Sequence, residues 1–374
     1  MKVLSIIDSF KGTILSSTLG KIITKELKRQ KIYAEYLPIS DGGDGFLDSL
    51  SSFKHLKRNH VKVLNPIGKK IKSYYLYDNA LQIAYLEMAK ASGLNLLKIK
   101  ELNPLKTSTH GLGQLILLAL EKGAKKIIIG IGGSATNDGG AGMLEVLGAK
   151  FYNEKQERII NINCEKLGMI KVLDYDLVLP LIKNCEFIIL SDVNNPLLGE
   201  MGATKVFSKQ KGAKESDIKV LESNLAHYAN IIEKTIGASY KDKPGAGAAG
   251  GVGFAFYAMF NVKYYSGIKY LLELINFKNK IKNFDIIITG EGKIDKQSFY
   301  GKVISEVLKQ AQSKKKILVC AVNTFSNQEL INFNIDYLFK IVDNIATMEE
   351  SLRRPKYYYK KLSKIIAMGI KELE

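Results

Sequence analysis

A glycine-rich segment that directly follows an apolar β-branched run constrains this chain more than any other feature. Ile127, Ile128 and Ile129 predict a strand, five glycines then fall among the eleven residues 130–140, and an apolar-periodic segment begins at Ala141. This order is typical of a strand, a tight turn and a helix. Glycine permits the positive φ angles of a tight turn. Such a turn can also present backbone N–H groups and a helix N-terminus to an anion.

The polar residues inside this turn favour an anion site over a purely structural turn. Ser134, Thr136, Asn137 and Asp138 supply hydroxyl, amide and carboxylate groups. The spacing is not that of a P-loop, because no Lys-Ser or Lys-Thr follows the last glycine, and the third glycine of a dinucleotide fingerprint is missing. The segment therefore indicates phosphate chemistry without matching either motif.

Length and composition indicate a soluble protein of two domains. The chain has 374 residues, of which 46% are hydrophobic and 25% are charged, as is ordinary for a globular protein with a substantial core. No apolar run is long enough for a membrane helix, and the first residues lack a signal-peptide layout. Cys164, Cys185 and Cys320 are too widely spaced for a metal or disulfide motif. We expect a cytoplasmic protein with no membrane partner.

The net charge of +18 does not by itself indicate a nucleic-acid partner. Lysine greatly outnumbers arginine, and the lysines are scattered over presumed helix surfaces. The tightest basic clusters are Lys314–Lys316 and the basic-aromatic run 353–361. Such a run can bind single strands, but a solvated helix face explains it better. A basic surface would also attract anionic substrates.

The order of apolar runs predicts a parallel α/β sheet with a second architecture inserted. Val3–Ile7 and Tyr33–Leu37 read as strands on either side of a helix over Ser16–Gln30, which is the rhythm of a parallel sheet. Three β runs without helices follow between residues 60 and 86, and they favour antiparallel pairing. Alternation of predicted helices and strands resumes at Leu112. Further strands are expected at Phe187–Leu190, Asp285–Thr289, Ile317–Val322 and Ile335–Val342.

Polar or glycine-rich loops follow five of the predicted strands. These loops are DSFKG (8–12), DGGDG (41–45), the glycine-rich turn, DVNNP (192–196) and GEGKID (290–295). One Asp after a strand is commonly a helix N-cap. Ligands of open α/β sheets bind at the carboxyl ends of the strands, so several such loops together indicate a site.

Within these loops each candidate residue has a structural alternative. Asp8 is either a helix cap or a site residue, and Lys11 is either a surface lysine or a point charge for a phosphate or carboxylate. Asp41 and Asp44 suit an Asx-turn as well as a site. Asp192 directly follows an apolar strand, so we expect it to be partly desolvated and suited to metal or proton chemistry.

The remaining candidate residues lie later in the chain, and none of the candidates is a catalytic histidine or cysteine. Glu291 and Asp295 could share a cation or a substrate hydroxyl across a glycine turn, and Gln210 and Lys211 offer an amide and a cation. His110 is expected to begin a helix. Carboxylates, lysines and glycine loops suit phosphoryl transfer, which needs phosphate cradling, Mg²⁺ held by carboxylates and a carboxylate to accept a hydroxyl proton.

Seven blocks of the sequence resemble those of bacterial glycerate kinases of the first type, in the same order. The blocks are DSFKG (8–12), DGGDG (41–45), GIGGSATNDGGAGML (130–144), SDVNNPLLG (191–199), FSKQKGA (207–213), KPGAGAAGGVGFA (243–255) and TGEGKID (289–295). They span nearly the whole chain. Small departures occur at Asp44, where Glu is common in the family, at Lys293, where Arg is common, and at Lys209.

The resemblance implies an ATP-dependent kinase that phosphorylates D-glycerate, generally at the 2-hydroxyl to give 2-phosphoglycerate, with Mg²⁺. A kinase of a related hydroxy or sugar acid, or one that forms 3-phosphoglycerate, would share these motifs. The alternative of a different class is a nucleic-acid-binding α/β protein, which would show steeply salt-dependent affinity. ATP and D-glycerate are the expected partners, with a homodimer as one possible assembly.

The resemblance also implies a two-domain α/β protein with its active site in the cleft between the domains. We assign residues 1–58, 106–134 and 262–374 to a parallel, doubly wound (Rossmann- or flavodoxin-like) domain. Residues 59–105 and 135–261 are assigned to an inserted mixed α/β domain.

We expect the following roles for the candidate residues. Asp192 or Asp295 is the general base, and Lys11 neutralises charge in catalysis. Glu291 and Asp192 hold the metal. The residues expected to bind substrate or phosphate are Asp8, Ser9, Asp41, Asp44, Gly132, Gly133, Ser134, Asn137, Asp138, Asn194, Gln210 and Lys211, with the turn acting through its backbone N–H groups.

Overall fold

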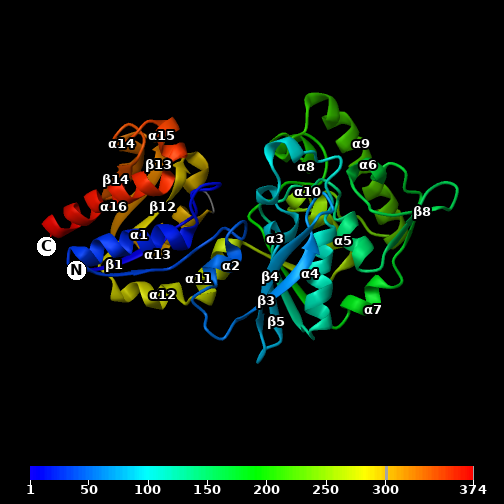
Figure 1. Cartoon of the computed structure of the whole chain (residues 1–374), viewed down its shortest axis with the longest axis horizontal. Helices are drawn as coiled ribbons and strands as arrows, with labels where there is room; N and C mark the ends of the chain where they lie inside the picture. The colour runs from blue at the N-terminus through cyan, green and yellow to red at the C-terminus, as the bar shows by residue number, and fades with distance from the viewer. Residues whose placement is uncertain (300–301, 374) are drawn as a thin grey trace. The chain divides into compact units, whose positions relative to one another are not determined.

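The computed structural model describes residues 1–299 and 302–373, which divide into two compact units. The first unit comprises Met1–Asp41, Asp48–Ser52 and Ser266–Glu374. The second comprises Gly42–Leu47 and Phe53–Tyr265. Both ends of the chain, blue and red in Figure 1, therefore belong to the first unit.

The first unit is built around five strands and the helices that connect them. Its elements are β1 (Lys2–Ile7), α1 (Ser16–Arg29), β2 (Tyr33–Tyr36), α11 (Gly267–Leu274), α12 (Phe277–Lys280), β12 (Ile286–Ile294), α13 (Val303–Gln310), β13 (Lys315–Asn323), α14 (Asn327–Asn332), β14 (Tyr337–Lys340), α15 (Met348–Arg353) and α16 (Pro355–Glu372). The helix α2 (Phe46–Ser49) is shared between the two units.

The sheet of the first unit is entirely parallel, with the strand order β14-β13-β12-β1-β2. Counted in the order in which this unit's strands occur, that is 2-1-3-4-5, the flavodoxin-like order, and its switch point lies between β1 and β12. The register pairs Ile7 with Gly290, and the N–H of Asp8 donates to the Gly290 carbonyl at 2.9 Å. The carboxyl ends of β1 and β12 are thus side by side.

Helices cover both faces of this sheet. Alternate residues of β13 enter different cores: Ile317 and Val319 pack with α1 and α16, whereas Leu318 and Cys320 pack with α13. In Figure 1, α1 and α16 lie next to each other. This alternation follows from the period of two along a strand and confirms the predicted parallel, doubly wound sheet.

The second unit combines a six-stranded mixed sheet, a small three-stranded sheet and several helices. Its elements are β3 (Lys57–Leu64), β4 (Lys70–Asp78), β5 (Ile83–Glu87), α3 (Ala89–Ser92), α4 (His110–Glu121), β6 (Lys126–Gly130), α5 (Ala141–Val146), β7 (Lys150–Tyr152), β8 (Arg158–Ile159), α6 (Cys164–Leu167), β9 (Val172–Asp174), α7 (Val178–Ile182), β10 (Glu186–Leu190), α8 (Ala203–Phe207), α9 (Glu215–Ile236), α10 (Ala248–Met259) and β11 (Val262–Tyr265).

The six-stranded sheet has the order β11-β10-β6-β5-β4-β3. The strands from β11 to β5 are parallel, whereas β3, β4 and β5 pair antiparallel. The antiparallel part confirms the pairing predicted for the β runs between residues 60 and 86. The small sheet, β8-β7-β9, is also antiparallel.

Two sequence-based expectations need correction. Residues 42–47, 53–58, 106–134 and 262–265 were assigned to the doubly wound domain, but they belong to the second unit. There, β6 pairs with β5 and β10, and β11 pairs with β10. The GEGKID segment was expected to be a loop. Most of it continues β12, whose ladder with β13 extends to the pair Ile294 and Asn323.

Within the described part of the chain, no helix combines the length and apolarity that a membrane crossing requires.

Two glycines of the first unit make a matched stability test. A Cβ on Gly290 would lie 1.8 Å from the Val319 carbonyl oxygen of the neighbouring strand, whereas a Cβ on Gly369 in α16 would meet nothing within 4 Å. We expect Gly290→Ala to lower the free energy of unfolding by about 2 kcal/mol or more. Gly369→Ala should raise it by about 0.5–1 kcal/mol, because alanine favours a helix interior. Urea unfolding of both variants is the measurement, and equal effects would contradict the strand packing described here.

Candidate active site

The switch point of the first unit gathers charged side chains at the carboxyl ends of its strands. Asp8 follows β1 and is 4% exposed. One of its carboxylate oxygens accepts the N–H of Ser9 at 2.7 Å. Lys11 Nζ donates to Asp41 Oδ2 at 2.7 Å. Glu291, on β12, interacts electrostatically with both Asp8 and Lys11. The structure therefore brings together four residues that the sequence placed in three separate loops.

This cluster holds more negative than positive charge, and its pKa values reflect that. Burial raises the pKa of Asp8 well above its usual range, and the nearby carboxylates of Asp41 and Glu291 raise it further. Burial also raises the pKa of Glu291, and the Asp41 carboxylate raises the pKa of Lys11. With three carboxyl groups against one lysine, the cluster is suited to hold a proton or to bind a cation.

Asp295 lies near this cluster, at the end of β12. Its backbone N–H donates to Ser298 Oγ at 2.9 Å, and its carboxylate is 3.8 Å from Lys293 Nζ. Charge repulsion from Asp295 contributes to the raised pKa of Glu291. The expected proximity of these two carboxyl groups is therefore present in the structure.

In the second unit, the glycine-rich loop packs directly against the DGGDG loop. A Cβ on Gly130 would lie 2.4 Å from the Gly42 carbonyl oxygen, and one on Gly132 would lie 2.5 Å from Gly43 Cα. Close backbone approach therefore requires glycine at both positions. Gly133 has a φ of +73° and remains exposed, so the first part of the loop is the part that faces solvent.

The rest of the loop is buried, and Lys211 holds it from the inside. Asn137 is fully buried, and Lys211 is only 2% exposed. Lys211 Nζ donates to Ser134 Oγ at 3.0 Å and to the Thr136 carbonyl at 2.7 Å. Burial lowers the pKa of Lys211 to about 7. This lysine contacts the loop itself, which its sequence context did not reveal.

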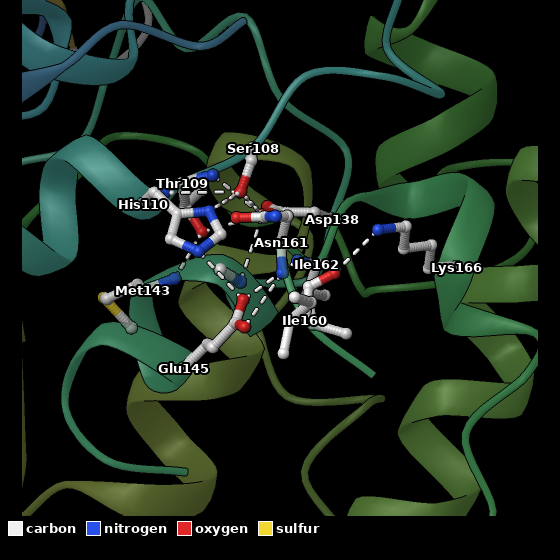
Figure 2. A network of polar contacts seen from close by, with 11 residues as sticks. Ser108, Thr109, His110, Asp138, Met143, Glu145, Ile160, Asn161, Ile162 and Lys166 are labelled. Carbon is white, nitrogen blue, oxygen red and sulfur yellow. Dashed lines mark hydrogen bonds and ion pairs between the residues drawn. The ribbon is translucent and has the colours of Figure 1, made fainter. Parts of the chain in front are cut away.

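The N-terminus of α5, expected to face an anion, is occupied by the chain's own Asp138. Figure 2 shows this fully buried side chain among Thr109, His110 and Met143. Its Oδ2 accepts the N–H and the hydroxyl of Thr109, each at 2.8 Å, and the N–H of Gly142 at 3.3 Å. Burial raises the pKa of Asp138, and the hydrogen bonds from Thr109 oppose that shift.

His110 begins α4, as expected, and its ring connects three segments of the second unit (Figure 2). Its Nδ1 is 2.6 Å from Ser108 Oγ, and its Nε2 is 2.8 Å from Glu145 Oε2. The Glu145 carboxylate also accepts the N–H groups of Asn161 and Ile162 at 2.9 Å each. The contacts of His110 and Glu145 therefore hold α4, α5 and the 160–162 segment together.

Three other candidates of the second unit are exposed: Asp192, Asn194 and Gln210. The expectation that Asp192 is partly desolvated is wrong, because β10 ends at Leu190 and the following residues leave the sheet. Asp192 and Glu291, the expected metal ligands, belong to different units. Among residues 1–299 and 302–373, no group of three His, Cys, Asp or Glu side chains is arranged to hold a metal ion.

Sequence reasoning missed Glu87 and Lys90. Glu87 is the last residue of β5 and is fully buried. Its carboxylate accepts the N–H of Gly45 at 3.1 Å and of Leu47 at 2.9 Å, and it lies 3.2 Å from Lys90 Nζ. The available signal was an acidic residue at the end of an apolar strand.

Comparisons with known proteins identify the family of this chain. The model of the glycerate kinase family matches residues 3–371. Glycerate 2-kinase from Escherichia coli (strain K12) is 37% identical over 357 residues, covering 94% of this chain and 93% of that protein. Glycerate kinase from Bacillus subtilis (strain 168) is 35% identical over 375 residues, covering 99% and 98%.

A solved structure extends the similarity to the whole fold. The crystal structure of a Salmonella typhimurium LT2 protein, provisionally named glycerate kinase 2, has 31% sequence identity and a TM-score of 0.79. The alignment covers 100% of this chain and 98% of that one. The chain therefore belongs to the glycerate kinase family and is a kinase.

Proposed function

We propose that the protein transfers the γ-phosphoryl group of ATP to D-glycerate, at the 2-hydroxyl, and forms 2-phosphoglycerate. Membership of the glycerate kinase family supports the reaction, and the name of the Escherichia coli relative, glycerate 2-kinase, supports the position. The observation that carries the proposal is the cluster of Asp8, Lys11, Asp41 and Glu291 at the switch point of the first sheet. Ligands of such sheets bind at this place.

Phosphoryl transfer depends on positioning and on charge neutralisation more than on covalent catalysis. Lys11 is held by Asp41 and carries a positive charge that the neighbouring carboxylates maintain. We assign it to the transferred phosphoryl group or to the substrate carboxylate, since a lysine acts on such groups as a point charge. Asp8 and Ser9 would line the same place.

The carboxylates of the first unit fit a Mg²⁺ ion that arrives with the nucleotide. Glu291 Oε1 is buried and has no hydrogen-bond partner among the residues that the structure describes. Mg²⁺ commonly binds through one or two carboxylates together with substrate phosphates, so a cage of three protein ligands is not required. Bound Mg²⁺ would neutralise phosphate charge during the reaction. Glu291 is the first candidate ligand, and Asp192, which belongs to the second unit, is the alternative candidate.

A carboxylate must accept the proton of the glycerate hydroxyl. Asp192 and Asp295 are both placed at the carboxyl end of a strand, one in each unit, and neither is buried. Both therefore stay candidates for the general base. In the second unit, the exposed part of the glycine-rich loop would contact an anionic group, while Asn137, Asp138 and Lys211 shape the loop from beneath.

The direct test is ATP consumption with D-glycerate and Mg²⁺, followed by identification of the product. We expect turnover with D-glycerate and 2-phosphoglycerate as the product. Glycerol, lactate and sugar acids serve as the comparison panel. Faster turnover with another hydroxy acid would reassign the substrate, formation of 3-phosphoglycerate would reassign the position, and no ATP turnover with any acid would refute the proposed function.

Two isosteric variants test the general base. We expect Asp192→Asn or Asp295→Asn to lower kcat at least about 100-fold, because general base catalysis typically contributes that much or more, while the circular dichroism spectrum stays unchanged. Asp242→Asn, at an exposed aspartate of the 241–243 turn, is the control. If both variants keep wild-type kcat while folded, neither residue is the base.

The buried Lys211 makes a pH-dependent contribution to stability. Its pKa falls from 10.5 to about 7 in the folded chain. Between these values the unfolded chain carries a proton that the folded chain lacks, so the free energy of unfolding rises with pH, by at most about 1.4 kcal/mol per unit. Lys211→Met should remove this pH dependence of the free energy of unfolding. Lys209→Met, at an exposed neighbour, should keep it.

The measurement is urea unfolding of both lysine variants and the wild type from pH 7 to pH 9.5. We expect the stability of the wild type relative to Lys211→Met to increase with pH across this range. A constant or decreasing difference would show that Lys211 is charged throughout in the folded protein.

A further inference from the structure

The exposed part of the glycine-rich loop presents unused backbone donors. The N–H groups of Gly132 and Gly133 donate no hydrogen bond to any residue in the described ranges. Two residues further along the loop do donate: the N–H of Ala135 to the Ser92 carbonyl, and the N–H of Gly139 to the Gly250 carbonyl. Two successive free N–H groups at an exposed turn form a concave donor site for an oxyanion.

Lys90 directly follows a residue that contacts this turn. The residue before it, Ala89, contacts Gly133 closely, since a Cβ on Gly133 would lie 3.4 Å from Ala89 Cβ. The Lys90 side chain is 23% exposed, and its Nζ lies 3.2 Å from the buried Glu87 carboxylate. Burial alone would lower the pKa of Lys90, but the carboxylates of Glu87 and Asp44 raise it above its usual value, so the ammonium group stays charged.

Glu87 fixes both sides of this arrangement. One of its oxygens accepts the N–H of Gly45 and pairs with Lys90, and the other accepts the N–H of Leu47. The same carboxylate thereby anchors the DGGDG loop and the lysine. Because Glu87 is fully buried and its oxygens are engaged, it positions these groups and does not itself face a ligand.

The opposite side of the turn carries groups that recognise hydroxyls. A Cβ on Gly133 would lie 3.7 Å from Asp44 Cβ, and Asn95 Nδ2 donates to Asp44 Oδ1 at 3.3 Å. A carboxylate and an amide of this kind accept and donate hydrogen bonds to a substrate hydroxyl. An anion-binding side next to a hydroxyl-binding side matches the chemistry of a small hydroxy acid.

We propose that Lys90 and the N–H groups of Gly132 and Gly133 bind the carboxylate of the hydroxy-acid substrate, with Asp44 receiving one of its hydroxyls. This inference rests on the proposed function, and it places the organic acid on the second unit. A phosphate of the nucleotide has similar anionic chemistry, so the experiment must distinguish the two sources.

The first arm is steady-state kinetics of Lys90→Met with D-glycerate and ATP varied in turn. We expect the KM for D-glycerate to rise roughly 10- to 100-fold, as the loss of a charge-assisted hydrogen bond would cause. The KM for ATP and kcat should change less than about 2-fold. Lys90→Arg should restore part of the D-glycerate affinity. Lys100→Met, at an exposed lysine of the same segment, controls for the lost charge.

The second arm is calorimetric titration of the full-length protein with D-glycerate, and separately with lactate and glycerol, without nucleotide. Lys90→Met should weaken binding of the two acids and leave that of glycerol, which lacks a carboxylate, unchanged. This arm does not depend on turnover, so it tests the carboxylate site even if D-glycerate proves a poor substrate. Weaker binding of any small hydroxy acid in the variant supports the site.

Three results would overturn the proposal. A rise in the KM for ATP with unchanged D-glycerate binding would assign the site to a phosphate. Equal losses in Lys90→Met and Lys100→Met would assign the effect to general charge. Wild-type binding of both acids in Lys90→Met, or no binding of either acid by the wild type, would show that the turn does not hold the carboxylate.

Discussion

The parallel register between β1 and β12 determines where the charged groups of the first unit lie. Because Ile7 pairs with Gly290 and the Asp8 N–H donates to the Gly290 carbonyl, the residues after β1 and those in the last part of β12 emerge side by side. The flavodoxin-like strand order makes this pair the switch point of the sheet, where helices leave on opposite faces and open a place for a ligand. A shift of this register by one residue would turn the side chain of Glu291 to the other face of the sheet.

The second unit depends on buried ionisable side chains that are each used to hold a loop. Burying a charge costs free energy unless hydrogen bonds or an opposite charge offset it. Asp138 meets that condition through Thr109 and Gly142, Glu87 through the DGGDG loop, and Lys211 through the glycine-rich loop. These three side chains therefore hold loops of the protein in place. Asp138 and Lys211 were expected to bind a ligand, and Glu87 was not among the expected site residues. The only part of the glycine-rich loop that faces outward is the part near Gly133.

The sequence predicted most strands correctly, but it predicted strand pairing and side-chain burial poorly, and both outcomes have physical reasons. Strands with strong periodicity were predicted because the period depends only on neighbouring residues. The assignment of residues 106–134 was wrong because strand pairing is a long-range property, which no local pattern encodes. Asp192 was expected to be desolvated because it follows an apolar strand, yet burial depends on where the chain goes after the strand ends. Glu87 went unnoticed for the same reason: its partners, Gly45 and Leu47, are distant in sequence.

The charged groups of the two units differ, and the ligand proposed for each unit follows from that difference. Three carboxyl groups around Lys11 would repel a triphosphate, and the nearby Asp41 carboxylate adds to the rise in the pKa of Asp8 that burial causes. A divalent cation bound to the nucleotide, as proposed above, would relieve this repulsion. The turn at Gly133 instead offers two free backbone N–H groups, with Lys90 held nearby by the buried Glu87 carboxylate. A metal-bound nucleotide therefore suits the first unit, and a small carboxylate suits the second.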